Sequence, residues 1–162
     1  KLRHSRVPFY RRNIGVVFQD FRLLPKMTVF ENIAFALEVL ALDKVTIRRR
    51  VREILELVSL QDKAKSFPDQ LSGGQQQRAT IARAIANHPK VLIADEPTGN
   101  LDPDKSAEIM ELLEKINEVE KTTVVMVTHD STIVDRFKKR TICLEEGYVV
   151  ADIMKGGYLK HD

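Results

Sequence analysis

The chain has 162 residues, of which 43% are hydrophobic and 30% charged, and its formal net charge is +3. This length suffices for one domain with its own core, and the composition is that of a soluble globular protein. The charge is too small by itself to indicate a nucleic-acid partner. The longest apolar stretch, Ile33 to Leu42, contains Glu38 and is too short to span a membrane, so any membrane role must come through a partner.

The first residues of the chain are basic. Five cations precede the first acid, Asp20, and they are Lys1, Arg3, Arg6, Arg11 and Arg12. We interpret them as a solvated surface segment, with contact to anionic lipid headgroups as the alternative. A nucleic-acid arm ranks third, because no interleaved aromatic pattern or base-reading motif follows.

A strand and a capped helix are predicted next. The apolar run from Ile14 to Phe18 predicts a buried strand that leads into polar Gln19. Thr28 with Glu31 three residues later is a capping box, which predicts a helix from about Val29 to Ala41.

Two further helices are predicted before residue 88. One follows Thr46, because Ile47, Val51, Ile54, Leu55 and Val58 recur on a single helical face. The other starts near Gln75 and ends before His88, and its small packing residues are Ala79, Ala82, Ile85 and Ala86.

From Val91 onward, strands and helices are predicted to alternate. Val91 to Ala94 is apolar on both faces, as a central parallel strand should be. Asp102 followed by Pro103 is an N-cap with proline at the first helical position. Thr122 to Val127 is a β-branched strand, and short strands are predicted at Arg140 to Leu144 and at Tyr148 to Val150. This layout predicts an α/β domain with a parallel sheet.

Two adjacent carboxylates, Asp95 and Glu96, follow the predicted central strand. Open α/β sheets bind ligands at the carboxyl ends of their strands. Two such acids can divide the work of a hydrolytic site, one holding Mg²⁺ and the other orienting and deprotonating an attacking water. By itself the acid pair would be interpreted as a helix cap or as a surface pair. Because the segment from Pro97 to Asp102 follows it directly, we reject that interpretation.

A second candidate site stands at a predicted helix N-terminus. Ser72 supplies a hydroxyl, Gly73 and Gly74 supply two unobstructed backbone N–H groups, and Gln75 supplies an amide. A helix N-terminus attracts anions. Ser-Gly-Gly alone is usually a turn with a cap, but the run to Arg78 and the spacing to Asp95 favour a functional site.

Taken in order, these segments resemble the ATPase domain of ABC transporters. The segments that carry the resemblance are Leu71-Ser72-Gly73-Gly74-Gln75, Val91 to Glu96, Gly99-Asn100-Leu101-Asp102 and Thr128-His129-Asp130. The resemblance spans essentially the whole chain and implies a P-loop NTPase core with a helical signature subdomain. Residues 28–87 would be that subdomain, and residues 1–27 and 88–162 the rest of a RecA-like core, within one domain over 1–162.

The resemblance also implies a role for each candidate residue. Glu96 is the predicted catalytic base, and Asp95 the Walker B aspartate that holds Mg²⁺. Gln19 matches a glutamine that touches Mg²⁺ and the attacking water, and His129 a histidine that contacts the γ-phosphate. The predicted ATP-binding residues are Ser72, Gly73, Gly74, Gln75 and Asp102, and the signature segment would act on ATP held by the other subunit of a homodimer.

The phosphate-binding loop of this family is not found in these 162 residues. That loop reads G-x-x-x-x-G-K-[ST], and none of the seven glycines here is followed by lysine. We expect the chain to be the C-terminal part of the domain and the 162-residue chain alone to be inactive. We also expect a gap in the sheet beside the strand from Thr122 to Val127, where related ATPases place the P-loop strand.

Within the family, the chain resembles the branch of FtsE-type cell-division ATPases. Arg11 to Leu24 and Thr28 to Leu37 carry this finer resemblance. It implies an FtsX-like integral membrane partner and a peripheral location on the cytoplasmic face of the cell membrane. The alternatives are the ATPase of a lipoprotein-release or MacB-type exporter, and a catalytically inactive interaction module.

Overall fold

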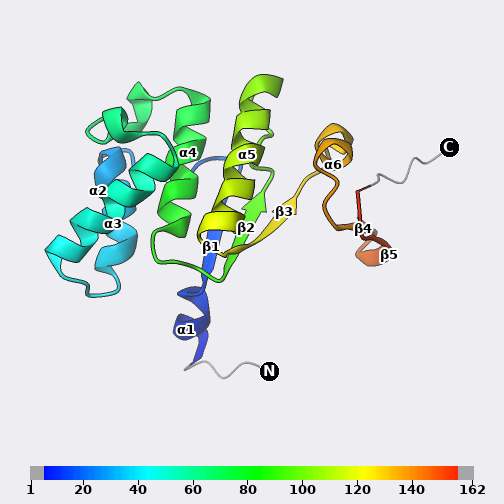
Figure 1. The fold of residues 1–162 in the computed structure, drawn as a ribbon, viewed down its shortest axis with the longest axis horizontal. Coiled ribbons are helices and arrows are strands. Elements are labelled where there is room, and N and C mark those ends of the chain that lie inside the picture. The colour runs from blue at the N-terminus through cyan, green and yellow to red at the C-terminus, as the bar shows by residue number, and fades with distance from the viewer. Residues whose placement is uncertain (1–5, 157–162) are drawn as a thin grey trace. The chain divides into compact units, whose positions relative to one another are not determined.

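The computed structural model describes residues 6–156 (Figure 1). The chain forms two compact units, one up to Val127 and one from Thr128 onward. Of the basic N-terminal residues, Lys1 and Arg3 lie outside the described residues, whereas Arg6, Arg11 and Arg12 are exposed. Within the described range, no helix combines the length and apolar character that crossing a membrane requires.

A three-stranded parallel sheet forms the centre of the first unit. Its strands are β1 (Ile14–Val17), β2 (Val91–Asp95) and β3 (Thr123–Val127), in the order β1-β2-β3. Val17 pairs with Ala94, and Asp95 with Val127. The predicted parallel sheet and the central position of the strand at Val91 are confirmed.

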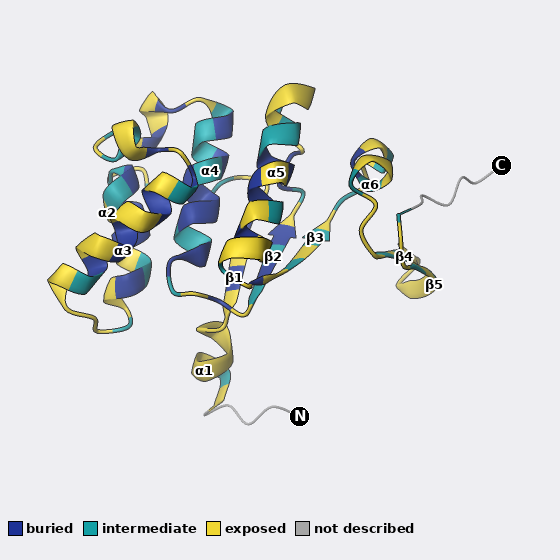
Figure 2. Cartoon of the chain, viewed as in Figure 1, coloured by how far each residue is buried: buried dark blue, intermediate teal, exposed yellow. Residues whose placement is uncertain are grey.

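The helices described before the end of the first unit pack against this sheet or against one another. They are α1 (Val7–Arg11), α2 (Val29–Glu38), α3 (Lys44–Leu57), α4 (Gly73–Ile85) and α5 (Pro103–Val119), with short 3₁₀ turns η2 (Gln61–Lys63) and η3 (Pro68–Gln70). Figure 2 shows buried residues gathered on α4 and on the sheet strands beside it. The apolar face predicted for the helix after Thr46 and the small packing residues predicted for the helix near Gln75 are buried in the structure.

The bounds of two helices differ from those predicted, and local geometry explains both. Helix α2 ends at Glu38 rather than Ala41, because the chain turns away at Ala41 with a positive φ of 55°. Helix α3 begins before Thr46, because the Asp43 carboxylate accepts hydrogen bonds from the N–H groups of Val45 and Thr46. Asp43 is therefore the cap, and Thr46 lies inside the helix.

The two faces of the sheet differ in their burial. The face that meets α4 carries Gly15, Val17, Leu92 and Ala94, all of which are buried. On the opposite face, Ile14 and Val16 are each 38% exposed, Val125 is 47% exposed and Val127 is 52% exposed. Within the described residues β3 pairs with β2 alone, so its outer edge is open.

The second unit contains α6 (Ser131–Phe137), which the sequence did not predict, and an antiparallel hairpin. The hairpin strands are β4 (Thr141–Glu145) and β5 (Tyr148–Ile153), close to the two strands expected there. Arg140 and Asp152 form an ion pair of 2.7 Å between these segments.

Gly15 permits the close approach of β1 to α4. A Cβ atom at this position would collide with the carbonyl oxygen of Ala84 and would lie 3.0 Å from Cδ1 of Leu92. We expect Gly15→Ala to lower the free energy of unfolding by about 1–3 kcal/mol, because the backbone of α4 must shift. Urea denaturation measures this loss. Gly73→Ala is the control, since its Cβ would have only Cδ2 of Leu101 nearby, at 3.4 Å. Equal stability of the two variants would contradict this packing.

Candidate functional site

Asp95 and Glu96 lie at the carboxyl end of β2. Asp95 is the last strand residue and is exposed, and Glu96 is half-buried. Glu96 has a φ of +44°, a left-handed conformation that costs a non-glycine residue about 1–3 kcal/mol and is frequent at active sites. Its N–H donates to Val127 O at 3.0 Å, and its carbonyl accepts from the Gly99 N–H at 3.1 Å. The acid pair therefore stands on a fixed turn.

The structure brings Gln19 to the loop that follows Glu96. Asn100 Nδ2 donates to the carbonyl oxygen of Gln19 at 3.0 Å. A Cβ atom on Gly99 would lie 2.9 Å from Gln19 Nε2, so the glycine leaves room for that amide. Because β1 and β2 are parallel neighbours, Gln19 and the acid pair follow the same edge of the sheet.

Asp95 and Gln19 offer the oxygen ligands that Mg²⁺ takes. This ion is usually bound through one or two carboxylates, with waters and substrate phosphates completing its shell. Among residues 6–156, no group of three or more His, Cys, Asp or Glu side chains is arranged to hold a metal. The donor set thus fits an ion shared with a phosphate ligand, and it does not form an all-protein cage.

Ser72 caps helix α4, and Gly73 and Gly74 form its first turn. Ser72 Oγ accepts from the Gln75 N–H at 3.3 Å, while Gln75 Oε1 accepts from the Ser72 N–H at 3.0 Å. This capping box leaves the Ser72 hydroxyl proton as a donor. The first-turn N–H groups have no acceptor within the helix, so the terminus suits an anion.

One salt bridge joins the start of α5 to α4, and a second lies within α5. Glu108 pairs with Arg78 at 2.9 Å and with Lys105 at 2.5 Å. The hydrogen bond from Lys105, followed by that from Arg78, holds the pKa of the Glu108 carboxyl below its usual value. A Cβ on Gly74 would lie 3.4 Å from the Lys105 side chain, which shows how closely the two helices approach.

Asp102 and His129 lie near the starts of helices α5 and α6, respectively. Asp102 Oδ1 accepts from the Lys105 N–H at 2.9 Å and caps α5, as predicted. His129 is exposed in the second unit, just before Asp130, which caps α6. Their contacts with ATP stay predictions.

Gln77 was not predicted as a site residue, yet it contacts the loop that follows Glu96. Its side chain is 1% exposed, and its Nε2 donates to the carbonyl oxygen of Pro97 at 2.7 Å. Its Oε1 is buried without a hydrogen-bond partner among residues 6–156, which costs about 1–3 kcal/mol. The available signal was its position between Gly74 and Ile81 on the buried face of α4, where an apolar residue is expected.

The protein family to which the chain belongs indicates the function of this arrangement of residues. The profile of the ABC transporter family matches residues 1–99. The chain belongs to the ABC transporter family of ATP-binding domains. This family membership supports an ATPase and confirms the resemblance read from the motifs.

Relatives in the ABC family include proteins named cell division ATP-binding protein FtsE. That of Bacillus subtilis is 58% identical over 161 residues, covering 99% of this chain and 70% of the relative. That of Streptococcus pneumoniae is 59% identical over 158 residues, covering 98% and 68%. That of Escherichia coli is 49% identical over 149 residues, covering 92% and 67%.

Solved ABC cassettes share the fold. A dimeric ATP-binding cassette in a post-hydrolysis state, bound to ADP and Pi, has a TM-score of 0.81 at 41% identity, covering 98% of this chain and 70% of its own. The cbiO1 protein of Clostridium perfringens, part of the ABC transporter complex cbiONQ, has a TM-score of 0.87 at 32% identity, covering 94% and 61%. The predicted ABC ATPase fold is confirmed, and the family binds nucleotide.

Proposed function

We propose that the chain acts as an FtsE-type ATP-binding subunit, which couples ATP turnover to a membrane partner in cell division. The observation that carries this proposal is the fixed turn at Asp95 and Glu96, beside Gln19 at the carboxyl edge of the sheet. Identities of 58% and 59% to proteins named FtsE favour this function over a lipoprotein or MacB-type exporter.

Each carboxylate has one task in this proposal. Glu96 accepts a proton from the attacking water, and its fixed turn supports that task because a general base must be held in place. Asp95 and Gln19 hold Mg²⁺, which neutralises charge on the phosphates when bound. His129 contacts the γ-phosphate.

The N-terminus of α4 serves the ATP of a second copy of the chain. The Ser72 hydroxyl and the first-turn N–H groups donate to phosphate oxygens, Gln75 keeps Ser72 in place, and the helix dipole favours the negative charge. The dimeric state of the solved ABC cassette with ADP and Pi supports a homodimer here.

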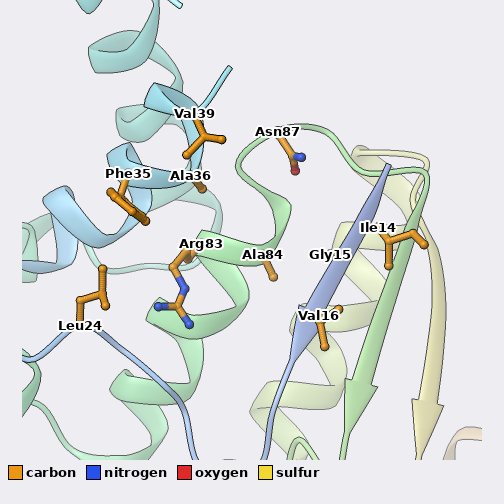
Figure 3. Close-up of a pocket in the computed structure, with 10 residues that line it drawn as sticks. All are labelled: Ile14, Gly15, Val16, Leu24, Phe35, Ala36, Val39, Arg83, Ala84 and Asn87. Carbon is orange, nitrogen blue, oxygen red and sulfur yellow. The ribbon is translucent and has the colours of Figure 1, made fainter. Parts of the chain in front are cut away.

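An apolar hollow of about 340 Å³ offers a place for the membrane partner (Figure 3). It is lined by Ile14, Gly15, Val16, Leu24, Phe35, Ala36, Val39, Arg83, Ala84 and Asn87. Phe35, in α2, is 45% exposed, and Val39, the C-cap residue of α2, is 66% exposed. We propose that an apolar segment of an FtsX-like integral membrane protein docks here, which places the chain on the cytoplasmic face of the membrane.

The segment after Gln19 links this hollow to the acid pair. Leu24 lines the hollow, and the chain between it and Gln19 is fastened to α4. Arg83 Nη1 donates to Arg22 O at 2.7 Å, and Thr80 Oγ1 donates to Phe21 O at 3.0 Å. Movement of α2 and α4 on docking would therefore reach Gln19.

A pair of valine substitutions tests this function in the product of the complete gene. Val39→Glu places a charge in the hollow, so we expect loss of co-purification with the membrane partner and the division defect of a gene deletion. Val119→Glu is the matched control, because Val119 is 61% exposed at the end of α5 and does not line the hollow. It should support normal division.

Two outcomes would contradict the proposal. Cells that divide normally after deletion of the gene would refute the role in division. Co-purification that Val39→Glu and Val119→Glu weaken equally would refute docking in the hollow.

A further inference from the structure

Gln77 lies where an apolar residue would normally stand. It is one turn beyond Gly73 and Gly74 in α4, and its side chain is 1% exposed among buried Ile81, Ile85 and Ala82. Burying an amide is unfavourable unless its polar atoms are hydrogen-bonded. The position therefore needs an explanation beyond packing.

Among the residues that the structure describes, the amide of Gln77 makes one hydrogen bond, and that bond reaches the loop that follows Glu96. Nε2 donates to Pro97 O at 2.7 Å, and Pro97 directly follows Glu96. The other half of the amide is unused, since Oε1 is buried and has no partner in the described part of the chain. A methionine would fill similar volume without that unpaired oxygen. Such departures from good packing occur mainly at functional sites.

The loop that Gln77 holds is the one that keeps Glu96 in its left-handed conformation. Two of its anchors are backbone hydrogen bonds, from Glu96 N–H to Val127 O and from Gly99 N–H to Glu96 O. The bond from Gln77 to Pro97 adds a tie to α4, whose N-terminus carries the candidate phosphate site. Gln77 thus connects two candidate sites through a single side chain.

We propose that Gln77 is a positioning residue that holds the Glu96 loop in register with the N-terminus of α4 for ATP hydrolysis. It touches neither ATP nor water, and it acts through the Pro97 carbonyl on the orientation of Glu96. A shift of α4 when its N-terminus meets phosphate is transmitted to the base by this bond. The proposal rests on the proposed role of Glu96.

Two substitutions in the product of the complete gene test it. Gln77→Met keeps the length and removes the donor, so we expect kcat to fall about ten- to hundredfold through misplacement of Glu96. The KM for ATP should stay within about twofold, because nucleotide contacts are untouched. Gln76→Met is the matched control, since Gln76 donates to Leu71 O at 3.2 Å and does not contact the loop. It should retain kcat.

The Gln77→Glu variant distinguishes a positioning role of Gln77 from a purely structural one. A buried carboxyl stays protonated to higher pH than an exposed one, and its O–H then donates to Pro97 O. We expect a kcat that is low above neutral pH and recovers as pH falls, with a profile unlike that of the unchanged protein. A kcat unaffected by Gln77→Met, or an unshifted profile of Gln77→Glu, overturns the proposal.

A Glu96→Gln variant measured in parallel distinguishes failure of the proposed function from failure of the inference about Gln77. Should Glu96→Gln leave turnover intact, the proposed function fails and the inference with it. Should Glu96→Gln abolish turnover while both Gln77 variants behave as the unchanged protein, the inference alone fails.

Discussion

Glu96→Gln is expected to lower ATP turnover by about 10²- to 10⁴-fold in the product of the complete gene, the range that general-base catalysis contributes. The substitution keeps the size of the side chain and its half-buried setting at the end of β2, but removes the group that accepts a proton from water. Nucleotide affinity should persist, because Glu96 is not assigned to the phosphates. Phosphate release measures turnover, and equilibrium binding of ATP measures affinity.

The control for Glu96→Gln is a glutamate on a neighbouring element. Glu111 is exposed on α5, and Glu111→Gln changes the net charge by the same amount. It should leave turnover within about twofold of the unchanged protein, as surface substitutions usually do. Full turnover by Glu96→Gln would remove Glu96 as the base and leave the catalytic assignment to be made again.

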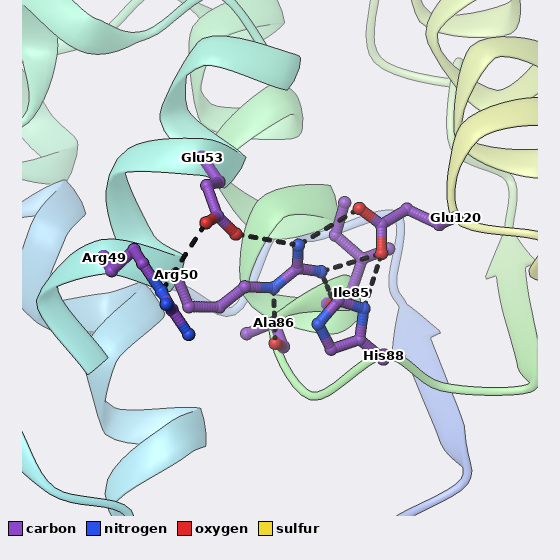
Figure 4. A network of polar contacts seen from close by, with 7 residues as sticks. All are labelled: Arg49, Arg50, Glu53, Ile85, Ala86, His88 and Glu120. Carbon is purple, nitrogen blue, oxygen red and sulfur yellow. Dashed lines mark hydrogen bonds and ion pairs between the residues drawn. The ribbon is translucent and has the colours of Figure 1, made fainter. Parts of the chain in front are cut away.

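The largest loss of stability is expected at Arg50, a buried cation of α3. Figure 4 shows its guanidinium between the end of α4 and Glu120. Nε donates to Ala86 O at 3.1 Å and Nη2 to Ile85 O at 3.2 Å. The Glu120 carboxylate accepts from Nη1 at 3.1 Å and from Nη2 at 2.9 Å, and it also meets His88 Nδ1 at 2.8 Å. One side chain thus joins α3, α4 and α5.

Arg50→Met should lower the free energy of unfolding by about 3–5 kcal/mol, because it leaves a buried carboxylate and two carbonyls without their main partner. Only 10% of the side chain is exposed on each of Arg50 and Glu120, so water does little to replace the lost bonds. Urea denaturation followed by circular dichroism measures the change.

Arg49 supplies the matched control for this substitution. Its side chain is 74% exposed and lies 3.8 Å from Glu53, so Arg49→Met should change stability by about 0.5 kcal/mol or less. The double variant Arg50→Met/Glu120→Leu should regain part of the loss, since an apolar pair replaces an ion pair at modest cost. Equal stability of Arg49→Met and Arg50→Met would show that the network is dispensable.

The pH dependence of the same network has a definite sign. Burial would raise the pKa of the Glu120 carboxyl, but the hydrogen bonds and charge of Arg50, with a smaller contribution from His88, leave it lowered. A carboxyl with a lowered folded-state pKa stabilises the fold above its unfolded pKa, and this stability is lost as pH falls through the folded pKa. Arg50→Met should therefore show a weaker loss of stability in acid than the unchanged chain.

The helix signals that were read correctly are local in the sequence. Thr28 with Glu31, and Asp102 with Pro103, lie within one helical turn of each other, so their geometry follows from the chain itself. The start of α3 was misplaced because Asp43 and Thr46 are both good caps, and local pattern does not say which of them binds the free N–H groups. Helix ends are decided by such competition.

The residues of the candidate site likewise fall into those that local sequence predicts and those that it does not. Asp95, Glu96 and the Ser72 to Gln75 segment are contiguous in sequence and carry recognisable motifs. Gln77 and Arg50 act across 20 and 36 residues of chain, on Pro97 and Ala86. Nothing in the neighbouring sequence of either residue identifies the carbonyl that it meets.

The sequence by itself determined the α/β class, the parallel sheet, the capped helices and the ABC motifs, because periodicity, caps and motif spacing are written in neighbouring residues. Only the tertiary structure decided that Glu96 adopts a left-handed turn, that Gln77 holds the loop behind it, and that Arg50 fastens three helices together. Those features depend on which distant backbone groups meet once the apolar faces have packed. Close packing depends on residues from the whole fold at once, so these contacts cannot be predicted from any short segment of the sequence.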